Sequence, residues 1–392
     1  MQKLRKVCLI TNYNLYESKR YFVEKLAEAM ERHGIKTMTM DVQQKVFGSE
    51  SMQSIREFAP DFTCSFNSFE PMEKGLYLWD YLQIPHVSFL VDPSFYSTTL
   101  INSPFSILTC VDRSDCDAVR SNKFENVFFW PHAVEKELAA DNEKRVYDVV
   151  LLGSCYDYES LRVAWQQRHP VSLNRVLDDA IDIVFSNEQA SLAQALVMAW
   201  EASKLDPRGV DFATLYYYLD NYTRGKDRVE LLRSIKNAKV HVFGELSADN
   251  AVGILGWKPY LASNSNVTIH PPTLFGEGLK ILKQSKIVLN SMPFFRDGSH
   301  ERIFTGLACG SLPITSESKY LREQFTHGQD LLFYQSKNRE AVSGMIDELL
   351  SNETKRSDMA AKGREIVMQR HTWDQRVEEL LKVLPPMLKS IE

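Results

Sequence analysis

The sequence predicts an α/β protein made of two Rossmann-like, doubly wound domains. Over residues 6–130, short β-branched or aromatic runs alternate with amphipathic stretches, which is the rhythm of consecutive βαβ units. Right-handed crossovers then favour a parallel sheet. A very apolar run, Asp148–Gly153, starts the pattern again, and 392 residues suffice for two hydrophobic cores. We expect the two domains to face each other across a cleft.

The first domain shows the clearest pattern and is placed at residues 1–145. An amphipathic helix is predicted over Ser18–His33, where Gly34 ends it. The predicted strands share an apolar or β-branched character and turn residues at their ends. They are Lys6–Thr11, Ile35–Met40, Asp61–Phe66, His86–Val91, Ser106–Val111 and Asn126–Trp130.

The second domain, residues 146–370, begins with one strand and then changes character. Helical patterning prevails over residues 158–237, with the clearest helix at Gln189–Lys204 and a turn at Asp206–Gly209, so we predict a helical insertion. Strands resume at Lys239–Phe243, Val267–His270, Ile287–Asn290, Leu312–Thr315 and Leu331–Tyr334. Residues 371–392 are expected to form a C-terminal helix.

Composition disfavours several classes of function. The net charge of −5 lacks the basic excess typical of proteins that bind nucleic acid or anionic membranes. The six cysteines lie in or beside apolar runs without CxxC spacing, which indicates reduced core thiols. After Lys3, Arg5 and Lys6 the apolar run Val7–Ile10 is too short for a signal peptide or a transmembrane segment. We expect a cytoplasmic protein; its oligomeric state is not indicated.

The segment Arg296–Gly310 is the most informative part of the chain. It places a polar, glycine-containing turn and a short predicted helix between the apolar runs Ile287–Asn290 and Leu312–Thr315. A helix that begins after a strand presents unpaired N–H groups to anions, so this pattern predicts a phosphate-bearing ligand. A diphosphate carries about two negative charges, and basic side chains must assist the helix terminus. The candidates are Lys280, Arg296, His300 and Arg302.

The same segment belongs to an ordered series of motifs. These are Asp297–Phe304 with Leu307–Gly310; Phe325, Gly328, Asp330 and Tyr334; Ile269-His270 and Lys286–Asn290 upstream; and His371–Trp373 with Arg376 downstream. The series resembles the C-terminal signature of CgeB-like (spore maturation type) glycosyltransferases of the group 1 superfamily. The resemblance covers roughly residues 240 to 390 and is looser in the N-terminal half, at Pro85, Ser88, Asp92-Pro93 and Trp130–His132.

The resemblance implies the GT-B architecture, with the active site between two Rossmann-like domains and a C-terminal helix that crosses back to the first. It implies a hexosyltransferase-type enzyme that uses a nucleotide-sugar donor, with a protein, glycan, lipid or small molecule as acceptor. We expect no cofactor and no metal, because protein dipoles and cations stabilise the departing diphosphate. Asp115-Cys116-Asp117 spells the DxD pattern of metal-dependent glycosyltransferases, but it lies in the first turn of a predicted helix, where Asp is favoured anyway.

The donor site departs from the superfamily at one position. Members often carry two glutamates eight positions apart, the later of which grips the ribose, whereas this chain has Asp297 and Thr305. Glu301 lies four residues before Thr305 on the same helix face, so it is a candidate to replace the missing carboxylate. Glu301 could pair with a cation or accept hydrogen bonds from sugar hydroxyls, and we favour the second role. The other predicted donor-binding residues are Gly153, Ser154, Asn290, Gly298 and Ser299.

Several of these residues also have structural interpretations. Gly153, with Ser154, would allow close backbone approach to phosphate, but a plain turn is equally compatible. Asp92 ends the apolar run Val87–Val91; partial burial would raise its pKa toward that of a general base, whereas a turn-forming or capping Asp is equally compatible. We predict that Asp92, His300 and Glu301 are catalytic.

On the acceptor side, Asn12, Tyr13 and Asn14 follow the first strand. The tyrosines at 216, 217, 218 and 222 could line an acceptor groove or pack between the inserted helices. A nucleotide-sugar epimerase and a non-catalytic nucleotide- or sugar-binding protein are the alternative functions. The donor base, the sugar and the stereochemical outcome are not indicated; the superfamily alone favours retention.

Overall fold

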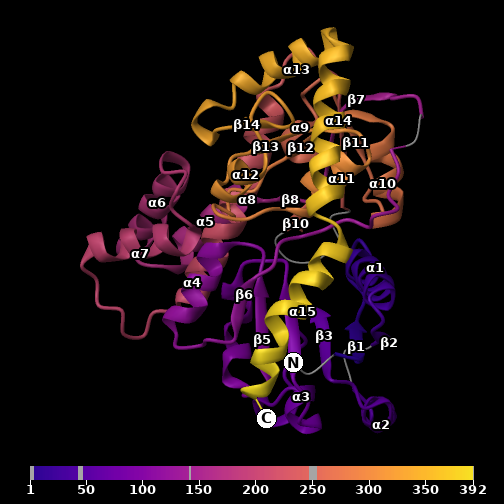
Figure 1. Cartoon of the computed structure of the whole chain (residues 1–392). Coiled ribbons are helices and arrows are strands. Elements are labelled where there is room, and N and C mark those ends of the chain that lie inside the picture. The colour runs from indigo at the N-terminus through magenta and orange to yellow at the C-terminus, as the bar shows by residue number, and fades with distance from the viewer. Residues whose placement is uncertain (1–3, 43–46, 141–142, 247–253, 392) are drawn as a thin grey trace. The chain divides into compact units, whose positions relative to one another are not determined.

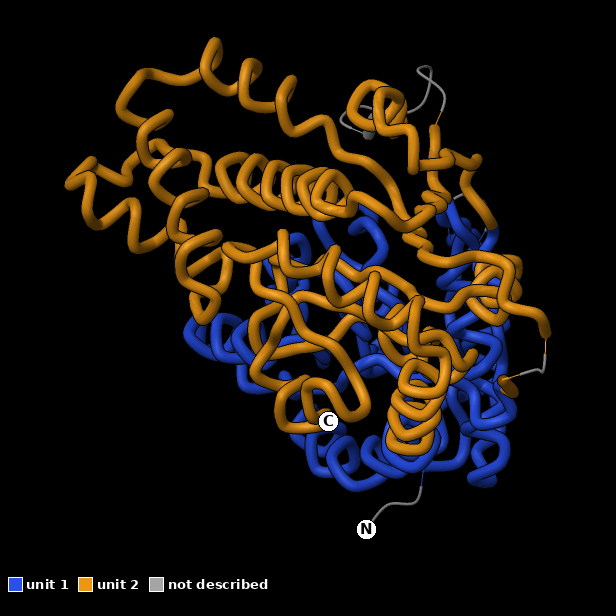
Figure 2. The backbone as a smooth tube through the Cα atoms, turned by 90° about the horizontal axis from the view of Figure 1, so that it is seen from above, with its two compact units in different colours: residues 1–138, 274–276, 367–392 blue, residues 139–273, 277–366 orange. Residues whose placement is uncertain are grey.

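The computed structural model describes residues 4–42, 47–140, 143–246 and 254–391. The chain divides into two compact units, coloured separately in Figure 2: residues 1–138, 274–276 and 367–392 form unit 1, and residues 139–273 and 277–366 form unit 2. Each unit contains a parallel six-stranded sheet with flanking helices (Figure 1). The predicted α/β class with two parallel sheets is confirmed.

Unit 1 is built on a sheet with the strand order β2-β1-β3-β4-β5-β6. The strands are β1 (Lys6–Thr11), β2 (Lys36–Asp41), β3 (Phe62–Phe66), β4 (His86–Leu90), β5 (Ser106–Cys110) and β6 (Val127–Phe129). The helices are α1 (Ser18–Arg32), α2 (Ser49–Phe58), η1 (Glu73–Gly75), α3 (Leu78–Leu82), η2 (Ser94–Asn102), α4 (Arg113–Ser121) and α15 (Trp373–Lys389). Each predicted strand of this domain is present, with ends shifted by at most one residue.

The two faces of this sheet bury alternate residues of each strand, as the period of two in a strand requires. Val7 and Leu9 of β1 pack in a cluster with residues of α1 and α15, whereas Cys8 and Ile10 pack with residues of α2, α3 and α4. This double burial explains why the strands read as continuous apolar runs in the sequence.

Helix α15 is anchored in unit 1 by a buried arginine. Arg376 donates from Nε to the carbonyl of Pro131 at 2.8 Å and from Nη2 to the carbonyl of His132 at 3.3 Å. On the outer surface, Arg32 of α1 forms a 2.6 Å ion pair with Asp374. The C-terminal helix therefore belongs structurally to the unit formed by the N-terminal residues.

Unit 2 has the strand order β11-β9-β7-β12-β13-β14. The strands are β7 (Tyr147–Leu152), β9 (Val240–Phe243), β11 (Val267–His270), β12 (Ser285–Asn290), β13 (Leu312–Ser316) and β14 (Leu332–Tyr334), with a small antiparallel pair, β8 (Cys155–Tyr156) and β10 (Ile254–Leu255). Taken in chain order, the sheet reads third, second, first, fourth, fifth, sixth, which is the Rossmann order. Its switch point, where ligands bind in such folds, lies between β7 and β12.

The helices of unit 2 include the predicted insertion. Its members are α5 (Tyr158–Arg168), α6 (Val171–Ser186), α7 (Leu192–Ser203) and α8 (Phe212–Ser234). The others are α9 (Lys258–Leu261), α10 (Phe275–Lys283), α11 (Glu301–Ala308), α12 (Lys319–Gln324), η3 (Ser336–Asn338), α13 (Ala341–Ser351) and α14 (Glu353–Arg370); α10 begins, and α14 ends, on residues assigned to unit 1.

Aromatic packing holds the inserted helices together. The Trp165 ring of α5 lies 5.7 Å from the Tyr218 ring and 5.2 Å from the Tyr222 ring, both on α8. Tyr216 is also buried, whereas Tyr217 is 37% exposed. The packing interpretation therefore accounts for most of the tyrosine cluster. All six cysteines are buried and none of them forms a disulfide, as the sequence predicted.

Candidate functional site

Two strand ends meet at the switch point of the second sheet. Gly153 follows β7 directly, and Asn290 is the last residue of β12. Gly153 has φ 153°, which L side chains rarely adopt, and its amide donates to the carbonyl of Phe243 at 2.8 Å. A Cβ at the neighbouring Gly244 would lie 2.1 Å from the Gly153 carbonyl oxygen, so the backbones approach closely here. The predicted glycine turn is thus built for close contact.

Two arginines from different helices converge on Gly153. A Cβ added to this glycine would lie 3.5 Å from Nη2 of Arg302 and 3.8 Å from Nη1 of Arg228, so the two guanidinium groups are neighbours. Arg228, on α8, also donates to the carbonyl of Ser154 at 2.8 Å. Two neighbouring cations beside a strand terminus form a site suited to an oxyanion, and guanidinium groups can bind phosphate oxygens bidentately.

Asn290 positions one of these arginines. Its side chain is fully buried, and its Nδ2 donates to Oγ1 of Thr315 at 2.9 Å. This contact turns Oδ1 toward Arg302, which donates to it from Nη1 at 3.0 Å. The guanidinium is therefore held in place before any ligand binds, and such preorganisation reduces the entropy that binding would cost.

Helix α11 begins at the predicted turn, but its first amides are partly occupied. His300 is the N-cap residue; its Nδ1 accepts a hydrogen bond from the Arg302 amide at 3.3 Å, and its carbonyl accepts one from the Ile303 amide at 3.2 Å. The cap therefore satisfies two of the amides at the start of the helix, those of Arg302 and Ile303. Ser299 offers a different donor, since its hydroxyl is buried without a hydrogen-bond partner in the described part of the chain.

Glu301 and Thr305 share a helix face, as predicted. Thr305 Oγ1 donates to Oε2 of Glu301 at 3.1 Å. Burial raises the pKa of Glu301, while the Arg302 guanidinium and the Thr305 hydroxyl act in the opposite direction. An oriented carboxyl that lies close enough to Arg302 to feel its charge can accept hydrogen bonds from hydroxyl groups.

Two of the predicted cations lie elsewhere. Arg296 is 4% exposed and donates to the carbonyls of Val184 and Ala190 at 2.5 and 3.2 Å, so it ties its loop to the α6–α7 segment. The Lys280 side chain is 68% exposed and pairs with Glu277 at 2.8 Å on α10. The structure does not bring either residue into the arginine pair.

The remaining loop residues fix the loop to α12. The Asp297 carboxylate lies 3.6 Å from Nζ of Lys319. The Gly298 carbonyl accepts a 2.7 Å hydrogen bond from the Ser318 hydroxyl, and Ser318 is also the N-cap of α12. These contacts stabilise the loop that carries Ser299 and His300.

Arg228 is the site residue that the sequence did not reveal. It lies near the end of the predicted insertion, 75 positions after Gly153, in a segment without a phosphate-binding pattern. Its guanidinium also lies 5.4 Å from the centroid of the Tyr156 ring. The sequence shows only an arginine within a stretch of helical patterning, which is equally compatible with an internal ion pair.

In unit 1, the predicted base is exposed. Asp92 accepts a 3.0 Å hydrogen bond from Nδ2 of Asn67 at the end of the neighbouring strand β3. Of the two interpretations that the sequence leaves open for Asp92, the exposed position in the turn after β4 favours the turn-forming one.

The predicted acceptor-side residues differ among themselves. Asn12 is buried and Tyr13 is 59% exposed. The side chain of Asn14 is used locally, because its Oδ1 accepts from the Lys19 amide at 3.1 Å and its Nδ2 donates to the Ser18 hydroxyl at 2.9 Å. Asn14 therefore orders the start of α1.

The DxD-like segment lies in the first turns of α4. Asp115 accepts a 2.8 Å hydrogen bond from the Ser94 amide, and Asp117 forms a 3.2 Å ion pair with Arg120. Within the described ranges, no group of three or more His, Cys, Asp or Glu side chains is arranged to hold a metal ion. Among the described helices, none has the length and apolar character needed to cross a membrane.

Comparison with known proteins identifies the fold. The chain is similar to sucrose-phosphate synthase from Thermosynechococcus elongatus, with a TM-score of 0.58 and 10% identity over 98% of this chain and 100% of that chain. It is also similar to Anabaena HepE in complex with UDP and glucose (TM-score 0.56, 11% identity, 97% and 100% covered) and to a glycosyltransferase from Rickettsia africae (0.55, 10%, 99% and 98%). The structure therefore has the GT-B fold, as the resemblance implied.

At the level of sequence, the match is confined to the second half of the chain. Residues 226–382 match the model of a family described as glycosyl transferase-like. The matched segment begins just before Arg228 and contains Asn290, Glu301 and Arg302. No curated protein sequence matches the chain significantly.

Proposed function

We propose that the protein is a glycosyltransferase that moves a sugar from a nucleotide-sugar donor to an acceptor. The observation that carries this proposal is the convergence of Arg228 and Arg302 on Gly153, at the switch point of a Rossmann-ordered sheet. The match of residues 226–382 to a glycosyl transferase-like family and the GT-B fold support it. The HepE structure contains UDP and glucose, which makes a uridine nucleotide the first ligand to test.

In this proposal the arginine pair binds the diphosphate. When the bond between the anomeric carbon and the β-phosphate oxygen breaks, negative charge grows on the diphosphate, and the two guanidinium groups stabilise it. The new bond forms between the anomeric carbon and an acceptor oxygen, whose proton must go to a base. Asp92 remains the predicted base.

Glu301 is assigned to the hydroxyl groups of the donor. Its carboxyl is oriented by Thr305, which occupies the position where superfamily members often have a ribose-binding glutamate. Glu301 would then replace that carboxylate from one helical turn earlier. The ordered motifs between residues 240 and 390 favour the CgeB-like subtype.

We propose that transfer needs no metal. Two fixed cations can balance the roughly two charges of the leaving group, which is the task of Mg²⁺ in metal-dependent enzymes. The test is turnover of UDP-glucose, GDP-mannose and ADP-glucose with EDTA or with Mg²⁺. Equal rates support metal independence, and a rate that requires Mg²⁺ contradicts it.

The donor proposal is tested by calorimetric titration with UDP, GDP and ADP. We expect at least one of them to bind with a dissociation constant below about 100 μM, equivalent to about 5.5 kcal/mol. Failure of all three to bind would contradict the donor site. Donor consumption that depends on an added acceptor separates a transferase from an epimerase, and binding without turnover would indicate a binding protein.

A further inference from the structure

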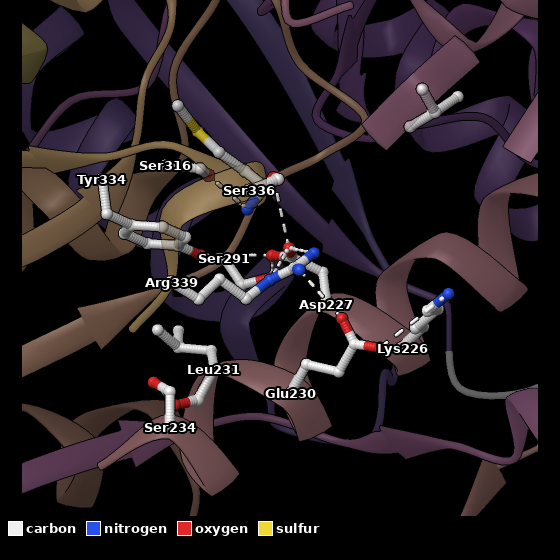
Figure 3. Close-up of polar contacts among 12 residues, drawn as sticks. Lys226, Asp227, Glu230, Leu231, Ser234, Ser291, Ser316, Tyr334, Ser336 and Arg339 are labelled. Carbon is white, nitrogen blue, oxygen red and sulfur yellow. Dashed lines mark hydrogen bonds and ion pairs between the residues drawn. The ribbon is translucent and has the colours of Figure 1, made fainter. Parts of the chain in front are cut away.

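A buried carboxylate lies next to Arg228 in the sequence. Asp227 of α8 is fully buried, and Arg339 donates to its Oδ1 from Nε and Nη2 at 2.9 and 2.5 Å (Figure 3). Arg339 also forms a 2.8 Å ion pair with Glu230, one helical turn further along α8. A charge buried to this extent is tolerated only with such partners.

The other contacts of Asp227 reach the ends of two strands. Its Oδ2 accepts hydrogen bonds from the Ser291 hydroxyl at 2.5 Å and from the Tyr334 hydroxyl at 3.1 Å. Ser336 donates to Oδ1 at 3.3 Å. Burial and the nearby carboxylate raise the pKa of Tyr334 well above its ordinary value, so its hydroxyl keeps the proton that it donates. Asp227 thus connects α8 to the residue after β12 and to the end of β14.

This connection determines where Arg228 lies. Successive helical residues project about 100° apart. While Asp227 is held by Ser291 and Arg339, Arg228 therefore points to a different side of α8, where it donates to Ser154. Ser291 follows Asn290, which orients Arg302. One buried carboxylate therefore fixes the helix of one site arginine to the strand that holds the other.

We propose that Asp227 is a positioning residue of the donor site: it locks the inserted helix α8 to β12 and thereby holds Arg228 beside Arg302 at Gly153. The proposal rests on the proposed donor function and deepens it. Asp227 itself does not touch the donor. The helical insertion is then an integral part of the site.

The test is a double-mutant cycle with a matched control. Asp227→Asn removes the charge, and Asp220→Asn makes the same change at another buried carboxylate of α8, which pairs with Arg224 at 2.6 Å on its own helix. With UDP as the probe, we expect Asp227→Asn to raise the dissociation constant about tenfold and Asp220→Asn less than twofold. In an Arg228→Ala background, Asp227→Asn should change the dissociation constant of UDP less than twofold, because Asp227 acts on binding through Arg228. Equal effects in both backgrounds would overturn the proposal.

A second readout needs no ligand and separates this proposal from the donor function. Hydrogen exchange of the free protein should be about tenfold faster over residues 153–156 in Asp227→Asn, and unchanged in Asp220→Asn. If UDP, GDP and ADP all fail to bind the wild-type protein, the donor function fails, and exchange at these residues still decides the role of Asp227. If residues 153–156 of Asp227→Asn exchange at the wild-type rate, that role is overturned. If Asp227→Asn does not fold, the test uses Ser291→Ala, which removes one hydrogen bond to Asp227. Exchange at residues 153–156 should then be about threefold faster than in the wild type, and an unchanged rate would overturn the role of Asp227.

Discussion

The carboxyl ends of the two sheets present their polar residues in opposite ways. In unit 2, Arg228 and Asn290 are buried and held by contacts between segments far apart in the chain. In unit 1, Asp92 is exposed, and Asn14 is occupied by the start of its own helix. A site fixed by distant contacts is preorganised, which favours tight binding of one ligand chemistry.

The two units differ also in their buried histidines. In unit 1, burial lowers the pKa of His86 to about 3, and burial and Arg376 lower the pKa of His132 and of His371 to about 3. In unit 2, His241 and His270 are partly exposed, and burial lowers their pKa less. Acid should therefore destabilise unit 1 more than unit 2.

The largest expected effect is the loss of stability of unit 1 at low pH. A histidine whose folded pKa is about 3 and whose unfolded pKa is about 6.5 binds protons preferentially in the unfolded state between these values. Stability is therefore lost as the pH falls below about 6.5, by roughly 2 kcal/mol per histidine at pH 5. The measurement is hydrogen exchange by segment at pH 7 and pH 5, corrected for intrinsic rates. At pH 5, strands β3, β4 and β5 should open before β12 and β13. Equal opening of both sheets would contradict the difference.

The second effect concerns the arginine pair. Arg302→Ala should raise the dissociation constant of UDP about a hundredfold, close to 2.7 kcal/mol, because a charge-assisted hydrogen bond to phosphate and the orientation provided by Asn290 are lost together. Lys280→Ala is the matched control, since Lys280 is basic and nearby in the sequence but exposed on α10. We expect less than a twofold change for it by calorimetric titration. A larger effect of Lys280→Ala would place the anion site on α10 instead.

The third prediction concerns the backbone conformation of Gly153 at the switch point and its role in UDP binding. Gly153→Ala should lower the free energy of unfolding by about 1–2 kcal/mol, because alanine disfavours φ 153°. It should also weaken UDP binding several-fold, because the strained backbone beside the arginine pair must change its conformation. Gly209→Ala is the control: Gly209 has φ 77° in a loop of the insertion, with open space around it. It should destabilise the protein similarly in urea denaturation and leave UDP binding unchanged. A binding loss in both variants would assign the effect to stability alone.

Local patterns in the sequence predicted the fold well and the site in part. Strands such as Lys6–Thr11 and Ile287–Asn290 are recognisable because burial on both faces demands apolar runs. The glycine after β7 and the start of α11 were also predicted, because turns and caps are determined by neighbouring residues. Strands, turns and helix starts that depend on neighbouring residues can therefore be predicted from the sequence.

The site predictions that differ from the structure concern side chains whose partners lie far away in the chain. Arg296 and Arg302 look equivalent in the sequence, yet one binds the carbonyls of Val184 and Ala190 while the other reaches Asn290. Arg228 was missed for the same reason, because only the packing of α8 against the sheet brings it to Gly153. Local spacing does not determine such contacts.

The smallest expected effect is the change in stability when a predicted catalytic carboxylate, Glu301 in unit 2 or Asp92 in unit 1, is replaced by its amide. Burial raises the pKa of Glu301, so its folded state binds protons more readily than its unfolded state, and stability declines as the pH rises from the ordinary glutamate value of 4.5 through the raised value. Glu301→Gln should therefore be as stable as the wild type near pH 4 and more stable at pH 7, by less than about 1 kcal/mol. UDP binding should weaken about fivefold.

The exposed Asp92 supplies the control for this comparison. Asp92→Asn should change the free energy of unfolding by less than about 0.5 kcal/mol at both pH values and leave UDP binding unchanged, because the carboxylate is exposed. If Asp92 is the base, its substitution should lower kcat without altering the affinity for the donor. Urea denaturation at both pH values and UDP titration of each variant distinguish the two carboxylates; a pH-independent stability difference for Glu301→Gln would show that its carboxyl titrates normally in the folded protein.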